Sequence, residues 1–261
     1  MAAPAAAGPN EAAGAAIDAY LAAGPPPSLS AATRGRCAAC DASCRWYCAK
    51  CVRWTDTGEA APPRVALPFA LDVVLRDAPG ASTGVHAALL AEAATLRVFP
   101  DDLDDASWDP ATTFVLFPQA GAKSVRALSA AHGAALRVVV LDAKWSNVGA
   151  VLAHPAVAKL QCCQLAEPPP LSRFWRYHNE REGCLSTIEA VYCAAREVGG
   201  GGGDDGDDDG LLDLLWLFRA LRQVIADTNG SRRAPRTPSG LGEPWSEARK
   251  AFARERRRQK L

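Results

Sequence analysis

The chain lacks an excess of charge of one sign, a long apolar run and a basic amino terminus. Its 29 Lys/Arg balance 29 Asp/Glu over 261 residues, which excludes a protein held to nucleic acid by bulk charge alone and an acidic solvating chain. No run of 18 apolar residues occurs, so we expect no membrane-spanning helix. No Lys or Arg precedes Arg34, which argues against a secretory signal. Glu11 and Asp18 argue against a mitochondrial presequence, whereas a plastid-type leader stays an open alternative.

The balance of charge is not local. Residues 231–261 hold ten Lys/Arg against three Asp/Glu, a net charge of +7, and five Asp fall within residues 204–209. The basic tail is the segment best suited to an anionic partner. It fits a nuclear signal, a contact to an RNA backbone or a solubilising tail, and the sequence does not separate these three interpretations. An intracellular protein, of nucleus or cytoplasm, is expected.

Composition divides the chain into segments. The 49% share of hydrophobic residues is enough to build a real core. The glycine run near residue 200 is not followed by Gly-Lys-Ser/Thr, so we interpret it as a linker and not as a phosphate-binding loop. The predicted segments are a disordered Ala/Gly/Pro-rich leader over 1–35 with at most a weak helix over 10–21, a cysteine module over 36–58, an α/β domain over 64–230 with a Gly/Asp insertion at 199–209, and the basic tail over 231–261.

Strand and helix patterns alternate between the cysteine module and the basic tail. Residues 136–141 are an apolar run suited to burial on both faces of a sheet. The other predicted strands are 71–75, 95–99, 113–117 and 159–165, and the predicted helices are 82–94, 122–132, 145–154, 186–198 and 211–227. This alternation predicts an α/β fold with a mostly parallel sheet.

The cysteine module contains two Cys-x-x-Cys pairs, Cys37/Cys40 and Cys48/Cys51, separated by seven residues. Two such pairs supply four thiolates, which is the tetrahedral sulfur shell of a structural Zn²⁺ site with no open position for chemistry. Reduced thiols without a ligand and an iron–sulfur cluster are the alternatives. Cys44 lies between the pairs and is interpreted as a spare thiol, with replacement of one of the four ligands as the alternative.

Two positions in the α/β part are candidates for chemistry. Asp142 follows the best strand and precedes the helix that begins at Trp145, and the carboxyl ends of parallel strands are where ligands bind. The alternative is that Asp142 caps this helix while Trp145 packs in the core. Ser186 and Glu189 form a capping box, and the amides of a helix start also suit a ligand carboxylate.

Residues 172–178 interleave basic and aromatic side chains, as in a loop that contacts RNA. The alternative is an ordinary surface segment after the prolines at 168–170. The four histidines lack metal-ligand spacing and are interpreted as surface or internally bonded side chains, and the remaining cysteines are interpreted as core residues: His86, His132, His154 and His178, and Cys162, Cys163, Cys184 and Cys193.

Taken together, these segments resemble the DTW-domain family, the tRNA-uridine aminocarboxypropyltransferases, with the eukaryotic type-1 branch the most similar. Five blocks stand in the family's order. They are the Cys-x-x-Cys pairs at 37–51 with Tyr47, Ser82-Thr83-Gly84-Val85-His86, Leu116-Phe117-Pro118, Asp142-Ala143-Lys144-Trp145, and Phe174-Trp175-Arg176 with Leu185-Ser186-Thr187-Ile188-Glu189-Ala190.

The resemblance implies a SPOUT-like α/β fold with a deep C-terminal knot. It implies an enzyme that uses S-adenosylmethionine as donor of its 3-amino-3-carboxypropyl group, N3 of a uridine in the tRNA D-loop as acceptor, and 5′-methylthioadenosine as by-product. By matching position it gives Asp142 the catalytic role. The cofactor-binding candidates are Ser82, Thr83, Leu116, Pro118, Trp145, Ser186, Thr187 and Glu189. Arg173 and Arg176 would meet RNA phosphate or the amino-acid carboxylate.

One position departs from the family pattern. The motif runs Asp-x-Thr-Trp, but Lys144 stands at the threonine position, where a cation beside a sulfonium would be unfavourable. Either Lys144 turns outward, or activity is reduced. A non-catalytic RNA-binding protein on the same fold and a SPOUT-type RNA methyltransferase are therefore the alternative functions.

Overall fold

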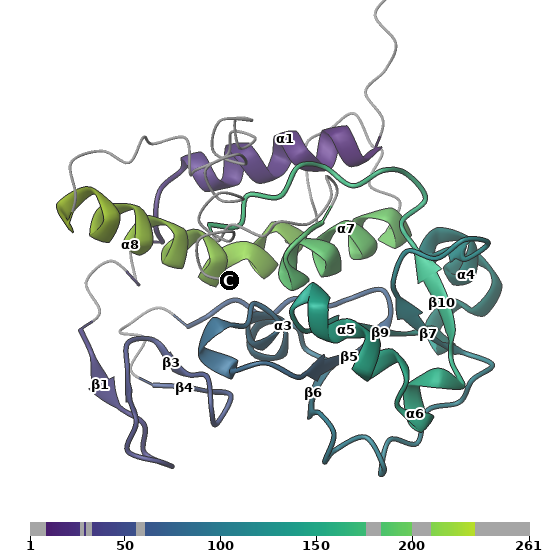
Figure 1. Ribbon diagram of the computed structural model, residues 1–261. Coiled ribbons are helices and arrows are strands. Elements are labelled where there is room, and N and C mark those ends of the chain that lie inside the picture. The colour runs from purple at the N-terminus through teal and green to yellow at the C-terminus, as the bar shows by residue number, and fades with distance from the viewer. Residues whose placement is uncertain are drawn as a thin grey trace, which may run out of the picture.

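The computed structural model describes residues 9–26, 29, 33–55, 61–175, 184–199 and 210–232. Its centre is a six-stranded sheet (Figure 1) in which every strand pair is parallel. In spatial order the strands are β6 (Ala94–Val98), β5 (Ala70–Leu75), β9 (Arg137–Asp142), β7 (Thr113–Leu116), β10 (Gln161–Gln164) and β8 (Lys123–Ser124). The predicted parallel α/β architecture is confirmed, whereas the knot stays a prediction.

The central strands are apolar because both faces of the sheet are covered. Successive side chains point to opposite faces, so Val138 packs in one hydrophobic cluster and Val139 in another. The first cluster lies against α3 (Gly84–Leu90), α4 (Val125–His132) and α7 (Thr187–Gly199). The second lies against α5 (Trp145–Leu152) and α6 (Pro155–Ala158).

The observed elements differ from the predicted ones mainly at their ends. The helix predicted over 82–94 is the shorter α3, because the chain enters β6 at Ala94. Residues 123–124 form the edge strand β8, so the next helix, α4, begins at Val125. The last predicted helix begins as a 3₁₀ turn, η3 (Leu211–Leu215), and continues as α8 (Trp216–Arg232). Another 3₁₀ turn, η1 (Pro79–Ala81), precedes α3, and η2 (Gly133–Ala135) precedes β9.

The amino-terminal segment contains a helix. The helix considered over 10–21 is present as α1 (Pro9–Ala22), which packs on α7 and η3 as an outer layer (Figure 1). It lies within the segment 1–35 whose composition predicts disorder. Ala13 and Ile17, one helical turn apart, are fully buried, and the Tyr20 hydroxyl donates to Asp213 at 3.0 Å. A few well-placed apolar side chains therefore stabilise a helix whose composition alone favours disorder.

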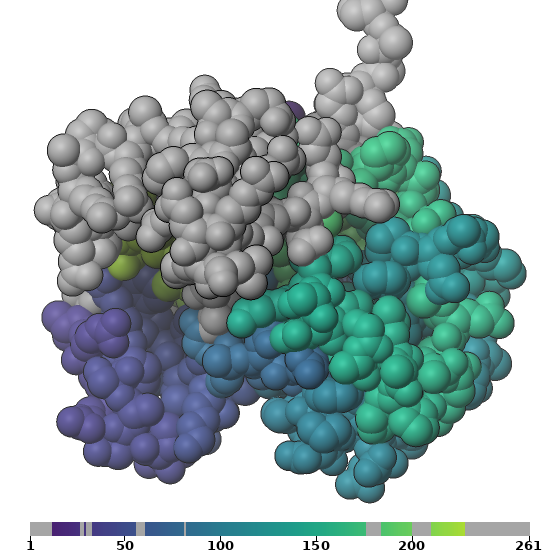
Figure 2. All heavy atoms as spheres, in the orientation of Figure 1, coloured from purple at the N-terminus to yellow at the C-terminus, as the bar shows by residue number. Residues whose placement is uncertain are grey.

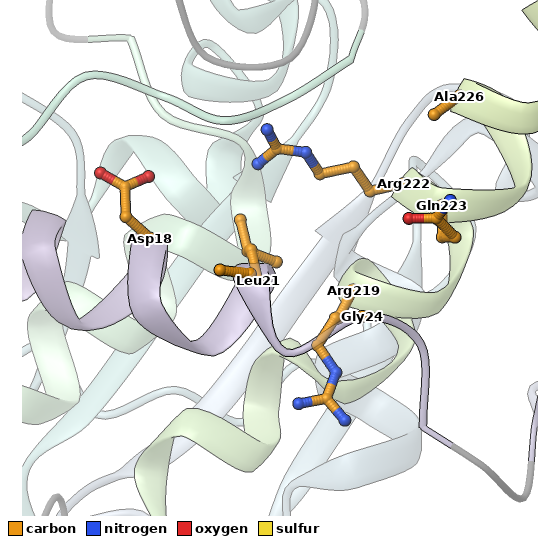
Figure 3. Close-up of a pocket in the computed structure, with 8 residues that line it drawn as sticks. Asp18, Leu21, Gly24, Arg219, Arg222, Gln223 and Ala226 are labelled. Carbon is orange, nitrogen blue, oxygen red and sulfur yellow. The ribbon is translucent and has the colours of Figure 1, made fainter. Parts of the chain in front are cut away.

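A pocket of about 310 Å³ lies between α1 and α8. Figure 3 shows Asp18 and Leu21 on the α1 side and Arg219, Arg222 and Gln223 on α8. The two guanidinium groups point in different directions in this view. They do not converge on a single ligand position.

The cysteine module consists of two short antiparallel hairpins that pack beside the sheet. β1 (Gly35–Arg36) pairs with β2 (Ser43–Cys44), and β3 (Tyr47–Cys48) pairs with β4 (Arg53–Trp54). Trp46 is buried in a cluster with residues of α3 and α8, and the Trp54 and Trp216 rings meet edge to face at 5.9 Å. In Figure 2 the module forms a lobe beside the α/β body.

Several sequence predictions lie outside the described residues. They include Arg176, His178, the Gly/Asp insertion after Gly199 and nearly all of the basic tail. Within the described ranges, no helix combines the length and apolar character needed to cross a membrane.

Asp72 in β5 provides a test of the fold. Its carboxylate is fully buried and accepts from Arg97 Nε at 2.6 Å and from the Arg137 guanidinium. Asp72→Ala leaves two guanidinium groups without their shared partner, and breaking a buried pair costs about 3–5 kcal/mol. We expect a fall of this size in the free energy of unfolding measured with urea. Asp104→Ala, which removes a side chain that is 88% exposed, should change it by less than about 0.5 kcal/mol. Equal effects of the two substitutions would contradict this account of the core.

Candidate active site and candidate metal centre

Asp142 is the last residue of β9, at the carboxyl edge of the parallel sheet. Its side chain is 8% exposed, and its Oδ2 accepts from the Ser82 hydroxyl at 2.8 Å and from the Gly84 N–H at 2.6 Å. The side chain of Thr187 also hydrogen-bonds to this carboxyl group. Three segments far apart in sequence therefore meet at one carboxylate, at the edge where open parallel sheets bind ligands.

The start of α3 fits against Asp142 only because residue 84 is a glycine. A Cβ at this position would lie 2.4 Å from Asp142 Oδ2 and 2.7 Å from Val73 Cγ1. The Ser82 hydroxyl also accepts from the Val85 N–H at 3.1 Å, which satisfies one of the amides at the helix start. The family block at 82–86 is thus explained by a close approach of backbone to carboxylate.

The pKa of the Asp142 carboxyl group is set by opposing influences. Burial raises the pKa of Asp142, and hydrogen bonds from Ser82, Gly84 and Thr187 act in the opposite direction. Desolvation disfavours the charged form of a carboxyl group, whereas donated hydrogen bonds favour it. A carboxyl group with a raised pKa is a stronger base when ionised, which is a property expected of a proton acceptor.

The cofactor-binding candidates fall into two groups. Ser82, Thr83 and Ser186 are buried, and the Thr83 Oγ1 accepts from the Ile188 N–H at 3.4 Å. These three residues join the starts of α3 and α7. Leu116 and Trp145 are partly buried and Pro118 is exposed, and the rings of Phe117 and Trp145 lie 6.0 Å apart. The loops after β7 and β9 are therefore neighbours.

Asp142 does not cap α5, so this alternative is wrong. The cap comes from Asp77, whose carboxylate accepts from the Lys144 N–H at 2.5 Å and from Asn147 Nδ2 at 3.1 Å. Asp77 follows β5, and the sequence analysis did not single it out. The Lys144 side chain is exposed, which agrees with the outward orientation that was one of the two expectations.

Glu189 has a positioning role in this structure. It is fully buried, and its Oε2 accepts from the Ser186 N–H at 2.9 Å and from the hydroxyls of Ser186 and Ser172, each at 2.6 Å. Its Oε1 accepts from the Arg173 N–H at 2.6 Å. The bond from the Ser186 N–H to the Glu189 carboxylate, one of the two bonds of the predicted capping box, is confirmed. With four donors from its own chain, Glu189 binds the 171–175 segment to the start of α7. Its contact with a cofactor stays a prediction.

Arg173 is also occupied within the chain. Its guanidinium donates to both carboxylate oxygens of Asp18 in α1 and to the Leu171 carbonyl. The paired side chain of Arg173 is only 12% exposed. A contact between Arg173 and RNA or a ligand carboxylate would require it to leave Asp18.

The four cysteines of the two pairs form one cluster. The Sγ atoms of Cys37, Cys40, Cys48 and Cys51 all lie within 4.8 Å of one another, and Cys40 and Cys48 approach to 3.6 Å. Tetrahedral zinc with Zn–S bonds of about 2.3 Å requires S···S separations of about 3.8 Å, so these residues fit the ion. Cys44 is turned toward the Ala42 carbonyl at 3.5 Å and lies outside this set.

The backbone of the module is shaped like a pair of metal-binding turns. Asp41 and Val52 each follow the second cysteine of a pair and have positive φ, 53° and 48°. Such a φ is strained for a β-branched residue and persists where the surroundings impose it. A hydrogen bond from the Ala39 backbone is the largest of the influences that lower the pKa of Cys37 to about 7. Thiolate is the form that binds a metal.

His86 was interpreted as a surface or internally bonded histidine, and the second interpretation is confirmed. It is fully buried in α3, and its Nε2 lies 3.0 Å from the Tyr47 hydroxyl. Tyr47 directly precedes Cys48. The sequence signal was the presence of both residues in the family blocks; their contact across 39 positions is visible only in the fold.

We expect Gly84→Ala to destabilise the protein by about 1–3 kcal/mol, because the added methyl group overlaps buried atoms of Asp142 and Val73. The matched control is Gly149→Ala in α5, where a Cβ meets nothing within 4 Å and should stabilise the helix by about 0.5–1 kcal/mol. Thermal unfolding of both variants measures the difference. A Gly84→Ala protein as stable as the control would contradict the close approach.

For the cysteine cluster we expect one zinc ion per chain with about four sulfur ligands, measured by metal analysis and X-ray absorption. Chelation should unfold the module, because binding energy at such sites is folding energy. Cys48→Ser should lose the metal, whereas Cys44→Ser, outside the cluster, should retain it. Metal-free protein that stays folded would count against the site.

No curated protein matches the chain. Among solved structures the chain is similar to the SAM-dependent rRNA:acp-transferase Tsr3 from Vulcanisaeta distributa, with 20% sequence identity, a TM-score of 0.41, and coverage of 62% of this chain and 79% of that chain. The family model of the DTW domain matches residues 45–223. This match spans well over half of the chain and contains Gly84, Asp142 and the second cysteine pair, so the chain belongs to the DTW domain family.

Proposed function

We propose that the chain transfers the 3-amino-3-carboxypropyl group of S-adenosylmethionine to N3 of a uridine in the D-loop of tRNA, with release of 5′-methylthioadenosine. Family membership and the five blocks support the activity. The observation that carries the proposal is the buried Asp142 carboxyl group, held at the carboxyl edge of the sheet with a raised pKa. The SPOUT-like knot belongs to the same proposal.

The reaction needs a base and an aligned donor. Uridine N3 carries an imide proton and is a poor nucleophile until this proton leaves. In the proposed step the proton passes to the Asp142 carboxylate, and N3 forms a bond to the donor's γ-carbon. The bond from this carbon to the sulfonium breaks, and its electron pair returns to sulfur as the neutral thioether. General-base catalysis of this kind contributes about 10²–10⁴-fold, and alignment of the reactants supplies much of the rest.

The surrounding residues fit roles in donor binding. Leu116, Pro118 and Trp145 offer apolar surface in the neighbouring loops after β7 and β9, and β9 ends at Asp142. The start of α7, at Ser186 and Thr187, is the positive end of a 13-residue helix and favours the carboxylate of the amino-acid group. We assign Glu189 the positioning of this helix start, because its oxygens already accept from Ser172, Arg173 and Ser186. The exposed Lys144 keeps its charge in solvent, which supports an active enzyme.

The direct test is incubation of the purified protein with S-adenosylmethionine and unmodified tRNA, followed by nucleoside mass spectrometry. We expect a uridine heavier by one aminocarboxypropyl group and an equivalent of 5′-methylthioadenosine. Release of S-adenosylhomocysteine would identify an RNA methyltransferase instead. Binding of several tRNAs with no turnover of the donor would identify the non-catalytic RNA-binding alternative.

The same assay tests Asp142. Asp142→Asn keeps an oxygen for the Ser82 and Gly84 donors but removes the basic carboxylate, so modification should fall by about 10²–10⁴-fold while the fold is retained. In the wild type kcat should fall as the pH is lowered through the raised pKa of Asp142, because only the ionised form accepts the proton. The control is Glu197→Gln, another buried carboxylate, which accepts from the Ala166 N–H at 2.9 Å. If Asp142→Asn modified tRNA at the control's rate, Asp142 would not be the base.

A further inference from the structure

A hydrogen bond connects the cysteine module to α3, the helix whose first residue donates to Asp142. The Tyr47 hydroxyl and His86 Nε2 are 3.0 Å apart, and the two rings meet edge to face at 5.7 Å. Tyr47 lies in β3 directly before Cys48 of the cluster, and His86 lies in α3. Because Tyr47 is adjacent to Cys48, an interaction that holds the cysteine cluster in place also holds Tyr47 in place.

His86 serves this bond as a neutral group. It is fully buried, and burial lowers the pKa of His86 to about 3, so the imidazole is uncharged at neutral pH. Among the described residues its second nitrogen, Nδ1, has no hydrogen-bond partner. An unpaired buried nitrogen is destabilising. An apolar side chain would fill this position without that cost, so the histidine is explained by what Nε2 does.

The bond lies within one helical turn of Gly84, which donates to the candidate base. His86 is two residues after Gly84, whose N–H donates to Asp142 Oδ2 at 2.6 Å. The α3 helix has only seven residues, so its own ladder of hydrogen bonds holds its orientation weakly. Val85 and Leu89 pack in the same cluster as Trp46 of the module. The module thus contacts the short helix through a polar bond and an apolar surface.

We propose that Tyr47 and His86 are positioning residues: their bond fixes the start of α3 and thereby the orientation of the Asp142 carboxylate for proton transfer. The catalytic part of this inference rests on the proposed function. Neither side chain bonds Asp142 directly among the contacts described, so their effect passes through Ser82 and Gly84. The cysteine module would then govern the geometry of the active site besides stabilising the fold.

The test compares Tyr47→Phe with Tyr20→Phe. Both substitutions delete one hydroxyl from a partly buried bond of 3.0 Å, to His86 and to Asp213 respectively, and should lower stability similarly. Only Tyr47→Phe should lower kcat, by about 10- to 100-fold, with KM for S-adenosylmethionine and tRNA nearly unchanged. Amide hydrogen exchange in the first turn of α3 should rise by about fivefold in Tyr47→Phe and stay unchanged in Tyr20→Phe.

Variants of His86 identify the bond as the cause. His86→Gln, whose amide can still meet the hydroxyl, should retain most activity, whereas His86→Leu should resemble Tyr47→Phe. The kcat of the double variant Tyr47→Phe/His86→Leu should be within about twofold of the kcat of the less active single variant, because both substitutions remove the same interaction. Multiplied effects in the double variant, or equal kcat and equal exchange in Tyr47→Phe and Tyr20→Phe, would overturn the inference.

Failure of the proposed function gives a different result. If the wild type transfers no group to RNA but Tyr47→Phe still loosens the first turn of α3, the coupling stands and the enzymatic assignment falls. If the wild type is active and exchange in α3 does not respond to Tyr47→Phe, the enzyme stands and the coupling falls.

Discussion

The hydrogen bonds onto the Asp142 carboxylate are the constraint on which the rest of the site depends. They connect β9 with a helix start that is 58–60 residues earlier in the chain, and through Thr187 with the start of α7. Because Gly84 has no Cβ, its amide reaches the carboxylate directly. The same contact makes the orientation of the short α3 decisive, and this helix is also where the cysteine module meets the α/β body.

Local pattern predicted the sheet and the position of Asp142, and it failed where distant contacts decide. The apolar run at 136–141 favoured a buried strand, and β9 confirms it, with Asp142 at the carboxyl edge of the sheet. By contrast, Asp77 was missed because it caps a helix that begins almost 70 residues later. The order of α1 depends on Ala13 and Ile17 meeting α7 and η3, which composition does not reveal. No period or spacing predicts such partners.

Arg173 lies in the segment that leads toward the predicted RNA-contacting residues, and both its backbone and its side chain are hydrogen-bonded within the chain. Its amide binds Glu189 at the start of α7, and its guanidinium binds Asp18 in α1. The helix α1 lies outside the residues that the family model matches. Through Asp18 it nevertheless supports a segment inside that range. A planar guanidinium suits carboxylate and phosphate alike. Arg173 pairs with the Asp18 carboxylate in this structure, and its contact with RNA or a ligand carboxylate stays a prediction.

Three of the buried carboxylates differ in the groups that stabilise their negative charge. Asp72 is offset by two guanidinium groups, and Glu189 by four neutral donors that occupy both of its oxygens. Asp142 has no cation bound to it among the contacts described. Its hydrogen-bond partners are the hydroxyl of Ser82, the amide of Gly84 and the side chain of Thr187. Burial therefore prevails and raises the pKa of Asp142. A buried carboxyl group with a raised pKa is more basic when ionised, which suits Asp142 to accept a proton.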